Sequence, residues 1–424
     1  MITLGCSKNL VDSEYILRQL QESGYEISHD SSQASETVII NTCGFINDAK
    51  EESIETILQY VKAKENGLIN RLYVIGCLSE RYKAELQKDI PEVDKYFGVN
   101  NIQEIVNGIN ADYKKELVGE RVITTPKHYA YLKISDGCDR HCSFCAIPLI
   151  RGKHISKPIE ALIAEAKYLA SKGVKELILI AQDLSYYGLD IYKKQKLPEL
   201  VDELSKINGI EWIRLHYFYP AKFPYKIIET IKNNPKVCKY IDIALQHISD
   251  NMLSKMRRNI TKKQTIELVN KLKTEIPGLH LRTTMLVGHP GETVEDFEEL
   301  LDFVKDVKFE RLGGFAYSDE ENTFAGDNYT DDVPEDVKQE RLSVLMEVQE
   351  NIASEINNGK IGKTFKVLID RFEDGKYYGR TEYDSPEVDN EVIIETDKTL
   401  KTGDFYNVKI TSADTFDLYG EVLI

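Results

Sequence analysis

The sequence contains no apolar run long enough to span a bilayer, and no basic segment followed by an apolar one stands at its start. It is also short of positive charge, with 54 Lys and Arg against 70 Asp and Glu and a formal net charge of −16. Proteins that bind nucleic acid normally carry a basic surface, so this balance argues against direct RNA binding and favours a basic protein partner. These absences predict a cytoplasmic protein with no membrane segment.

Cysteine is scarce, and the positions of the cysteines argue against a fold held together by disulfide bonds. The chain has seven cysteines in 424 residues, and six of them stand in apparent ligand positions. Such usage suits a reducing cytoplasm better than a disulfide framework. By length the chain should fold as about three domains.

Three of the cysteines lie within eight residues, where positions 136–148 read DGCDRHCSFCAIP. The thiolates of Cys138, Cys142 and Cys145 could converge on zinc, Cu(I) or an iron–sulfur cluster, which soft ligands select. A structural zinc site needs four ligands, and His141 lies between two of the cysteines, where its ring would struggle to reach the same ion. A cubane cluster has four irons, so three cysteines would leave one iron open to bind a reactant. The spacing therefore favours an iron–sulfur cluster, with a zinc knuckle as the alternative.

The first 120 residues repeat a pattern of strand, cysteine and helix three times. The expected strands are 2–4, 37–40 and 71–75, and the expected helices are 9–22, 48–65 and one capped by Ser79. Alternating strands and helices predict a parallel sheet, whose strands all end along one edge. Cys6, Cys43 and Cys77 should meet at that edge, and the nearby helix N-termini should favour their thiolate forms. The alternative is that they are three buried small hydrophobes.

Six further apolar strands separated by helical patterns follow between residues 125 and 358. They predict an open, partial version of the eight-fold barrel, a (βα)6 sheet, at 131–135, 176–181, 213–218, 240–245, 280–287 and 312–317. Ligand-binding residues in barrels of this type follow the carboxyl ends of strands. The polar candidates at these ends are Gln182, Asp183, His216, Gln246, His247 and Thr284. Of these, His216, Gln246 and Thr284 could equally be hydrogen-bonded polar residues of the core. Pro334 opens a helical pattern to about residue 357 that should bridge to the last domain, and Cys238, placed before a strand, should be structural.

Short alternating strands and glycines from residue 360 onward predict a small all-β barrel of the oligonucleotide-binding kind. Nine Lys and Arg face fourteen Asp and Glu in this part of the chain. An acidic barrel is a poor phosphate binder but a reasonable docking surface for a basic protein.

The CxxxCxxC loop resembles the signature of the radical S-adenosylmethionine (SAM) enzymes. The resemblance implies that SAM chelates the open iron and that one electron cleaves SAM to give a 5′-deoxyadenosyl radical. It also implies that Phe144 lies near the adenine, although Phe144 could equally be a core aromatic. Gln182, Asp183, Gln246 and Thr284 would then be candidates to hold SAM. A domain with three cysteines joined to such a loop is similar to the methylthiotransferases, which carry two 4Fe-4S clusters and end in a TRAM domain.

Within that family, LGCSKNLVDSE at residues 4–14 and RGKH at 151–154 resemble the RimO branch, whereas the tRNA-modifying MiaB branch usually has Gln-Met-Asn after its first cysteine. The resemblance implies methylthiolation of the β-carbon of an aspartate in the small-subunit ribosomal protein S-twelve. An electron donor would be required, and SAM would serve both as methyl donor and as radical source. Cys6, Cys43 and Cys77 would hold the cluster whose open iron carries the sulfur.

We therefore expect a methylthiotransferase α/β domain at 1–120, a radical SAM partial barrel at 125–358 and a TRAM barrel at 360–424. A tRNA methylthiotransferase is the first alternative, and a non-catalytic metal-binding scaffold is the second.

Overall fold

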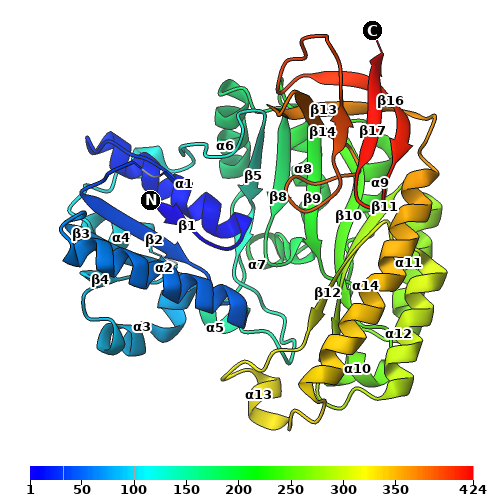
Figure 1. Ribbon diagram of the computed structural model, residues 1–424, viewed down its shortest axis with the longest axis horizontal. Coiled ribbons are helices and arrows are strands. Elements are labelled where there is room, and N and C mark those ends of the chain that lie inside the picture. The colour runs from blue at the N-terminus through cyan, green and yellow to red at the C-terminus, as the bar shows by residue number, and fades with distance from the viewer. Residues whose placement is uncertain (32, 100, 424) are drawn as a thin grey trace.

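Three β-structures of four or more strands follow one another along the chain in the computed structural model, which describes residues 1–31, 33–99 and 101–423 (Figure 1). A four-stranded parallel sheet comes first, a six-stranded parallel sheet second and a closed five-stranded barrel last. The predicted fold class, α/β with a small β-barrel at the end, is confirmed. None of the helices in the described part of the chain has both the length and the apolar character needed to cross a membrane.

The N-terminal sheet is covered by helices on both faces. Its strands, in spatial order, are β1 (Ile2–Thr3), β2 (Thr37–Thr42), β3 (Arg71–Gly76) and β4 (Lys95–Tyr96). Its helices are α1 (Ser7–Glu22), α2 (Asn47–Glu65), α3 (Cys77–Asp89) and α4 (Ile102–Gly108), and a 3-10 turn, η1 (Lys115–Leu117), follows. Successive strand residues point to opposite faces, so Ile40 and Val74 pack on the side of Ile57, whereas Ile39 and Tyr73 join a separate core. All four strands run parallel to one another, so their carboxyl ends lie along one edge of the sheet.

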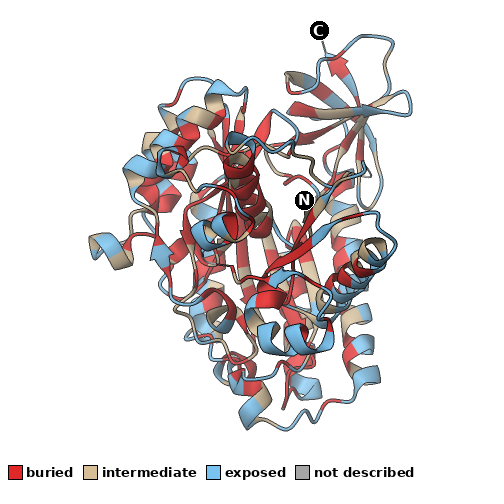
Figure 2. Ribbon diagram, turned by 90° about the vertical axis from the view of Figure 1, so that its left-hand side faces the viewer, coloured by how far each residue is buried: buried red, intermediate tan, exposed pale blue. Residues whose placement is uncertain are grey.

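The central sheet is an open half-barrel with helices outside it. Its strands, in spatial order, are β12 (Arg311–Ala316), β11 (His280–Val287), β10 (Val237–Gln246), β9 (Trp212–Phe218), β8 (Glu176–Ile180) and β5 (Tyr129–Lys133). The outer helices include α6 (Ile159–Ser171), α8 (Leu197–Ser205), α9 (Ile227–Asn233), α11 (Lys262–Glu275) and α12 (Val294–Val307). Figure 2 shows the strands mostly buried and the helices exposed on their outward sides. All six predicted strands are confirmed, with ends that differ by a few residues.

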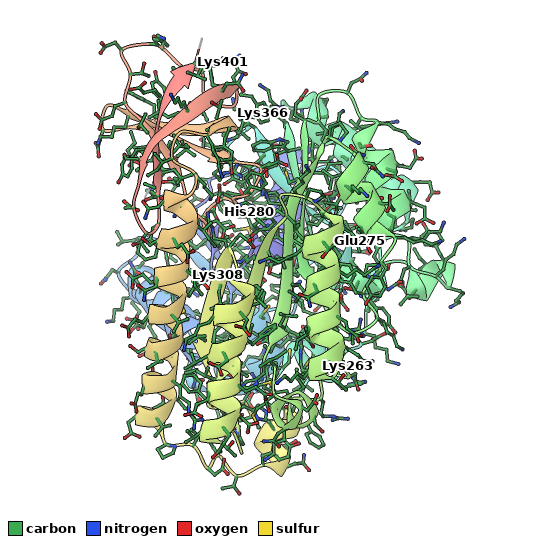
Figure 3. The ribbon with its side chains drawn as sticks, turned by 90° about the vertical axis from the view of Figure 1, so that its right-hand side faces the viewer. Lys263, Glu275, His280, Lys308, Lys366 and Lys401 are labelled. Atoms are coloured by element: carbon green, nitrogen blue, oxygen red, sulfur yellow. The ribbon has the colours of Figure 1, made fainter. Side chains whose placement is uncertain are left out.

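Short elements follow the carboxyl ends of the central strands. They are β6 (Ser135–Asp136), α5 (Ile147–Arg151), β7 (Ile155–Ser156), η2 (Leu184–Tyr186), α7 (Leu189–Tyr192), α10 (Asp250–Lys255) and α13 (Phe324–Asn328). The long helix α14 (Glu335–Asn358) packs against β12 and α12 and ends beside the last barrel (Figure 3), as the sequence predicted.

The last barrel closes through the strand order β13 (Thr364–Glu373), β14 (Lys376–Thr381), β15 (Val392–Ile394), β17 (Leu418–Leu423) and β16 (Phe405–Ala413). Its β14 and the loop after it bind residues at the amino ends of the central strands. Arg380 Nη2 lies 2.9 Å from Glu176 Oε2, and Arg311 Nη2 lies 2.6 Å from Asp384 Oδ1. His280, which opens β11 and is labelled in Figure 3, stacks on Tyr383 at a centroid distance of 4.0 Å. This contact covers the amino end of the half-barrel, so ligands are left with the carboxyl end.

This interface should make the protein sensitive to acid. Burial alone would raise the pKa of Asp370, but the Arg380 guanidinium and the hydrogen bond with His128 outweigh burial and lower this pKa to about 2. A carboxyl whose pKa is lower in the folded state stabilises it fully above the unfolded value of about 3.8, and this stabilisation is lost as the pH falls to 2. We expect Asp370→Asn to lose about 2 kcal/mol of unfolding free energy at pH 6 and almost none at pH 2, measured by urea unfolding. An equal loss at both values would contradict this assignment.

Two local predictions are wrong. Ser79 does not cap a helix, because α3 already begins at Cys77 after Gly76, whose φ of 101° ends the strand abruptly. The Ser79 hydroxyl is buried and has no hydrogen-bond partner among the described residues. Cys238 lies inside β10 rather than before it. Cys238 packs with Trp212 and Leu368, which agrees with its predicted structural role.

Candidate functional site

The first three cysteines stand at the ends of three adjacent parallel strands. Cys6 precedes α1, Cys43 follows β2 directly, and Cys77 follows β3 as the first residue of α3. The loops approach closely because of glycine: a Cβ atom on Gly5 would lie 2.7 Å from Cys43 Cβ, and one on Gly44 would lie 2.7 Å from Leu78 Cα. The ionised forms of Cys6 and Cys43 both act electrostatically on Cys77. The structure thus brings the three thiols together, as the strand pattern predicted.

The expected thiolate character is wrong for two of these thiols. Burial raises the pKa of Cys77 to about 12, against the smaller lowering effect of Arg151. Burial also raises the pKa of Cys43. For Cys43, burial outweighs the hydrogen bonds from the Phe45 and Gly44 amides, so the protonated form of both Cys43 and Cys77 is favoured in the absence of metal. Metal binding would supply the missing stabilisation, since a coordinated thiol is deprotonated outright.

The second three cysteines lie in the loop between β6 and α5. Gly137 makes the turn with a φ of 71°, and a Cβ atom there would lie 2.1 Å from the carbonyl oxygen of Lys153. The Cys138 amide donates to the Gly152 carbonyl at 3.0 Å, and the Ser143 amide donates to the Met256 carbonyl at 3.0 Å. These bonds fix the loop at the carboxyl end of the half-barrel. Burial raises the pKa of Cys138 to about 12 and also raises that of Cys145.

Each group of three has a buried arginine beside it, and sequence reasoning gave neither arginine a role. Arg258 Nη1 donates to Cys142 Sγ at 3.0 Å, and Arg151 Nη2 donates to Cys77 Sγ at 3.7 Å. The Tyr219 hydroxyl also lies 3.7 Å from Cys142 Sγ. Hydrogen bonds to cluster sulfurs and local charge are the means by which proteins tune such centres.

Arg151 also ties the two groups together. Its guanidinium lies 3.0 Å from Asp12 Oδ2 of α1 and 3.2 Å from Asp136, two residues before Cys138. Cys77 packs in one apolar cluster with Ala146, which follows Cys145. The two groups therefore adjoin across the contact between the N-terminal sheet and the half-barrel.

The arrangement of the described side chains does not suit the binding of a single metal ion. Within residues 1–31, 33–99 and 101–423, no group of three or more His, Cys, Asp or Glu side chains is gathered to hold one metal ion. A cubane cluster has a different geometric requirement, because each thiolate binds a separate iron atom of the cluster. Two groups of three soft ligands with an arginine beside each fit such clusters.

Three of the predicted SAM-contacting residues lie at the carboxyl end of the half-barrel. Gln182, Gln246 and Thr284 are partly exposed although they stand on or just after central strands. Gln182 Nε2 donates to Asp136 Oδ1 at 3.3 Å, while its buried Oε1 has no partner in the described structure. This end of the sheet therefore has free polar groups and room for solvent.

The other candidates already have partners. Asp183 accepts from Arg140 Nε at 2.8 Å and from the Ser185 amide at 2.7 Å. Phe144 lies edge-to-face with His289 at a centroid distance of 6.3 Å. His216 Nε2 lies 3.0 Å from Ser385 Oγ of the last barrel, and His247 Nε2 lies 3.1 Å from Glu292 Oε1. The two histidines thus have structural partners.

Comparison with protein families divides the chain in the same way. Residues 1–98 match an uncharacterized protein family, UPF0004. Residues 132–304 match the radical SAM superfamily, and residues 361–423 match the TRAM domain.

Full-length relatives are similar throughout. The ribosomal protein uS12 methylthiotransferase RimO of Phocaeicola vulgatus is 59% identical over 425 residues, covering 100% of this chain and 98% of the relative. The same-named proteins of Bacteroides fragilis and Flavobacterium johnsoniae are 56% and 55% identical, with 98% and 97% of their lengths covered. Among solved structures, the radical SAM methyltransferase TsrM of Kitasatospora setae, with cobalamin and a 4Fe-4S cluster bound, aligns with a TM-score of 0.57 at 14% identity, covering 77% of this chain and 76% of that one. This last likeness concerns the fold alone.

Proposed function

This chain belongs to the RimO family of ribosomal protein uS12 methylthiotransferases, and from that premise we propose that its two groups of three cysteines each hold a 4Fe-4S cluster. It is a radical SAM enzyme that acts on uS12, and its superfamily uses one 4Fe-4S cluster with SAM. The second cluster is our proposal. The observation that carries it is the meeting of Cys6, Cys43 and Cys77 at the ends of three adjacent strands, beside the other group.

The roles divide between the two groups. Cys138, Cys142 and Cys145 would hold the cluster that binds SAM, with Phe144, Gln182, Asp183, Gln246 and Thr284 around it. Cys6, Cys43 and Cys77 would hold the cluster that carries the sulfur. We propose domains at 1–120, 125–358 and 360–424 for these tasks.

When bound, the SAM cluster supplies one-electron chemistry that yields a radical able to take hydrogen from an unactivated carbon, which no side chain can do unaided. The target we propose is the β-carbon of an aspartate in uS12. The protein's own residues position and shield the reactants. Arg140, paired with Asp183 and 4.2 Å from the Tyr219 ring centroid, holds the cysteine loop in place. Buried Arg151 holds the two groups at a fixed separation.

The charge of the chain supports a basic protein as substrate. The last barrel has fourteen acidic against nine basic residues from Lys360 onward, which suits uS12 better than RNA. We therefore propose that the enzyme contacts its substrate without binding RNA directly. A separate electron donor is also required.

Incubation with each substrate class separates this proposal from the tRNA alternative. The reconstituted enzyme, SAM, a reductant and a sulfide source are incubated with either uS12 or tRNA. We expect one methylthio group on a uS12 aspartate by mass spectrometry and none on tRNA. Modification of tRNA alone would overturn the proposal.

A further inference from the structure

Lys8 is a buried cation that forms no direct ion pair within the described part of the chain. It is the second residue of α1, two residues after Cys6, and its side chain is about nine-tenths buried. Among the described residues its ammonium has no hydrogen-bond acceptor and no carboxylate partner. Its contact is the face of Tyr217, whose ring centroid lies 3.3 Å from Nζ.

The neighbouring cations are paired. Lys133 binds Asp12 and lies 2.7 Å from Asp136, and Arg151 lies 3.0 Å from Asp12. Burial raises the pKa of Asp242 to about 6 against the opposing charges of Arg282 and Lys8, and Asp242 forms no ion pair with Lys8 in the described structure. Burying a charge without a partner is costly, and a cation–π contact returns only about 2 kcal/mol even when desolvated. An unpaired ammonium here therefore calls for a ligand.

Tyr217 places Lys8 at the end of the half-barrel where ligands bind. Tyr217 is the sixth residue of β9 and has a φ of 68°, a strained value for a bulky residue. Gln246, which ends the adjacent β10, has a φ of 73°. Tyr217 and Gln246 are partly exposed, as is Thr284 on β11. Lys8 thus extends from the N-terminal sheet to the solvent-accessible carboxyl end of the half-barrel.

Lys8 also stands between the two cysteine groups. Cys6 lies two residues before it, and the next residue, Asn9, accepts from Arg151 Nη2 at 2.6 Å. Arg151 in turn binds Asp136, close to Cys138. A ligand anion on Lys8 would therefore lie near both groups.

We propose that Lys8 binds the carboxylate of the target aspartate and so selects an acidic residue as the site of modification. This inference rests on the proposed function. The β-carbon of aspartate is bonded directly to the carboxylate carbon, so an ion pair with Lys8 fixes the position of the carbon that reacts. Such positioning lowers the entropic part of the barrier. Lys8 is a specificity-determining residue in this account.

The test measures the affinity of the reconstituted full-length enzyme for two forms of uS12. One form is the natural protein, and the other carries Asn in place of the aspartate that mass spectrometry finds modified. We expect wild-type enzyme to bind the Asp form roughly 30-fold more tightly, the equivalent of about 2 kcal/mol for a buried charge pair. Lys8→Met should bind both forms equally and weakly, whereas Lys8→Arg should keep most of the preference. Iron content per chain, equal in all three enzymes, is the control for folding.

Three outcomes overturn the proposal: wild-type enzyme that binds both forms equally, Lys8→Met that keeps the preference, or Lys8→Met that loses SAM affinity instead. The last would mean that Lys8 holds the carboxylate of SAM. The first outcome needs no variant, so it decides the matter even if Lys8→Met fails to fold. Failure of the proposed function is distinguishable, because wild-type enzyme would then not modify uS12 at all.

Discussion

Replacing Cys142 with alanine should abolish both SAM cleavage and methylthio transfer to uS12. Cys142 is the central one of the three ligands proposed for the SAM cluster, and Arg258 Nη1 donates to its sulfur at 3.0 Å. The chemistry belongs to the cofactor, so the remaining side chains supply no alternative route and the rate should fall to that of the reaction without enzyme. Formation of 5′-deoxyadenosine, followed by chromatography, measures the first loss, and the mass of uS12 measures the second.

Two further cysteines give the matched comparison. Cys77→Ala should still cleave SAM but should not transfer a methylthio group, because it disrupts only the other group. Cys238→Ala should keep both activities, since Cys238 is a buried core residue beside Trp212. Retained SAM cleavage in Cys142→Ala, or lost cleavage in Cys238→Ala, would refute the assignment of ligands.

Glu176→Gln should destabilise the folded chain by about 3–5 kcal/mol, the usual cost of breaking a buried ion pair by removing one partner. Glu176 Oε1 lies 2.7 Å from Arg214 Nε, and Glu176 Oε2 lies 2.9 Å from Arg380 Nη2. All three side chains are at most 2% exposed. The amide would leave the buried Arg214 guanidinium without the carboxylate that neutralises it, and Arg380 would keep only Asp370. Urea unfolding followed by circular dichroism measures the effect.

The same substitution on the surface is the control. Glu203 pairs with Lys206 at 2.6 Å, but their side chains are 45% and 66% exposed. Glu203→Gln should therefore change the unfolding free energy by no more than about 0.5 kcal/mol. If Glu176→Gln lost no more unfolding free energy than Glu203→Gln, the contact between the half-barrel and the last domain would not depend on Glu176.

The elements that position the site could be predicted from sequence because they are local and periodic. Strong apolar runs gave the six central strands, and a cysteine after each of three strands gave the first group once a parallel sheet was inferred. Parallel strands share one edge, so residues as distant as Cys6 and Cys77 meet without any further information.

What the sequence could not reveal depends on contacts between distant segments. Arg258 lies 116 residues from Cys142, and no local pattern marks its role. Arg380 and Glu176 are 204 residues apart and look like ordinary surface charges in the sequence. Lys8 was visible only as part of a family segment, because its lack of a partner is a property of the folded chain. The raised pKa values of Cys43, Cys77, Cys138 and Cys145 likewise follow from burial, which is a property of the folded chain.

The number of clusters per chain tests the account most directly. Mössbauer spectroscopy of the anaerobically reconstituted enzyme should give two 4Fe-4S clusters per chain in the wild type. Alanine variants of either trio, Cys6, Cys43 and Cys77 or Cys138, Cys142 and Cys145, should each retain one. A single cluster in the wild-type enzyme, unaffected by removing the first trio, would contradict the account.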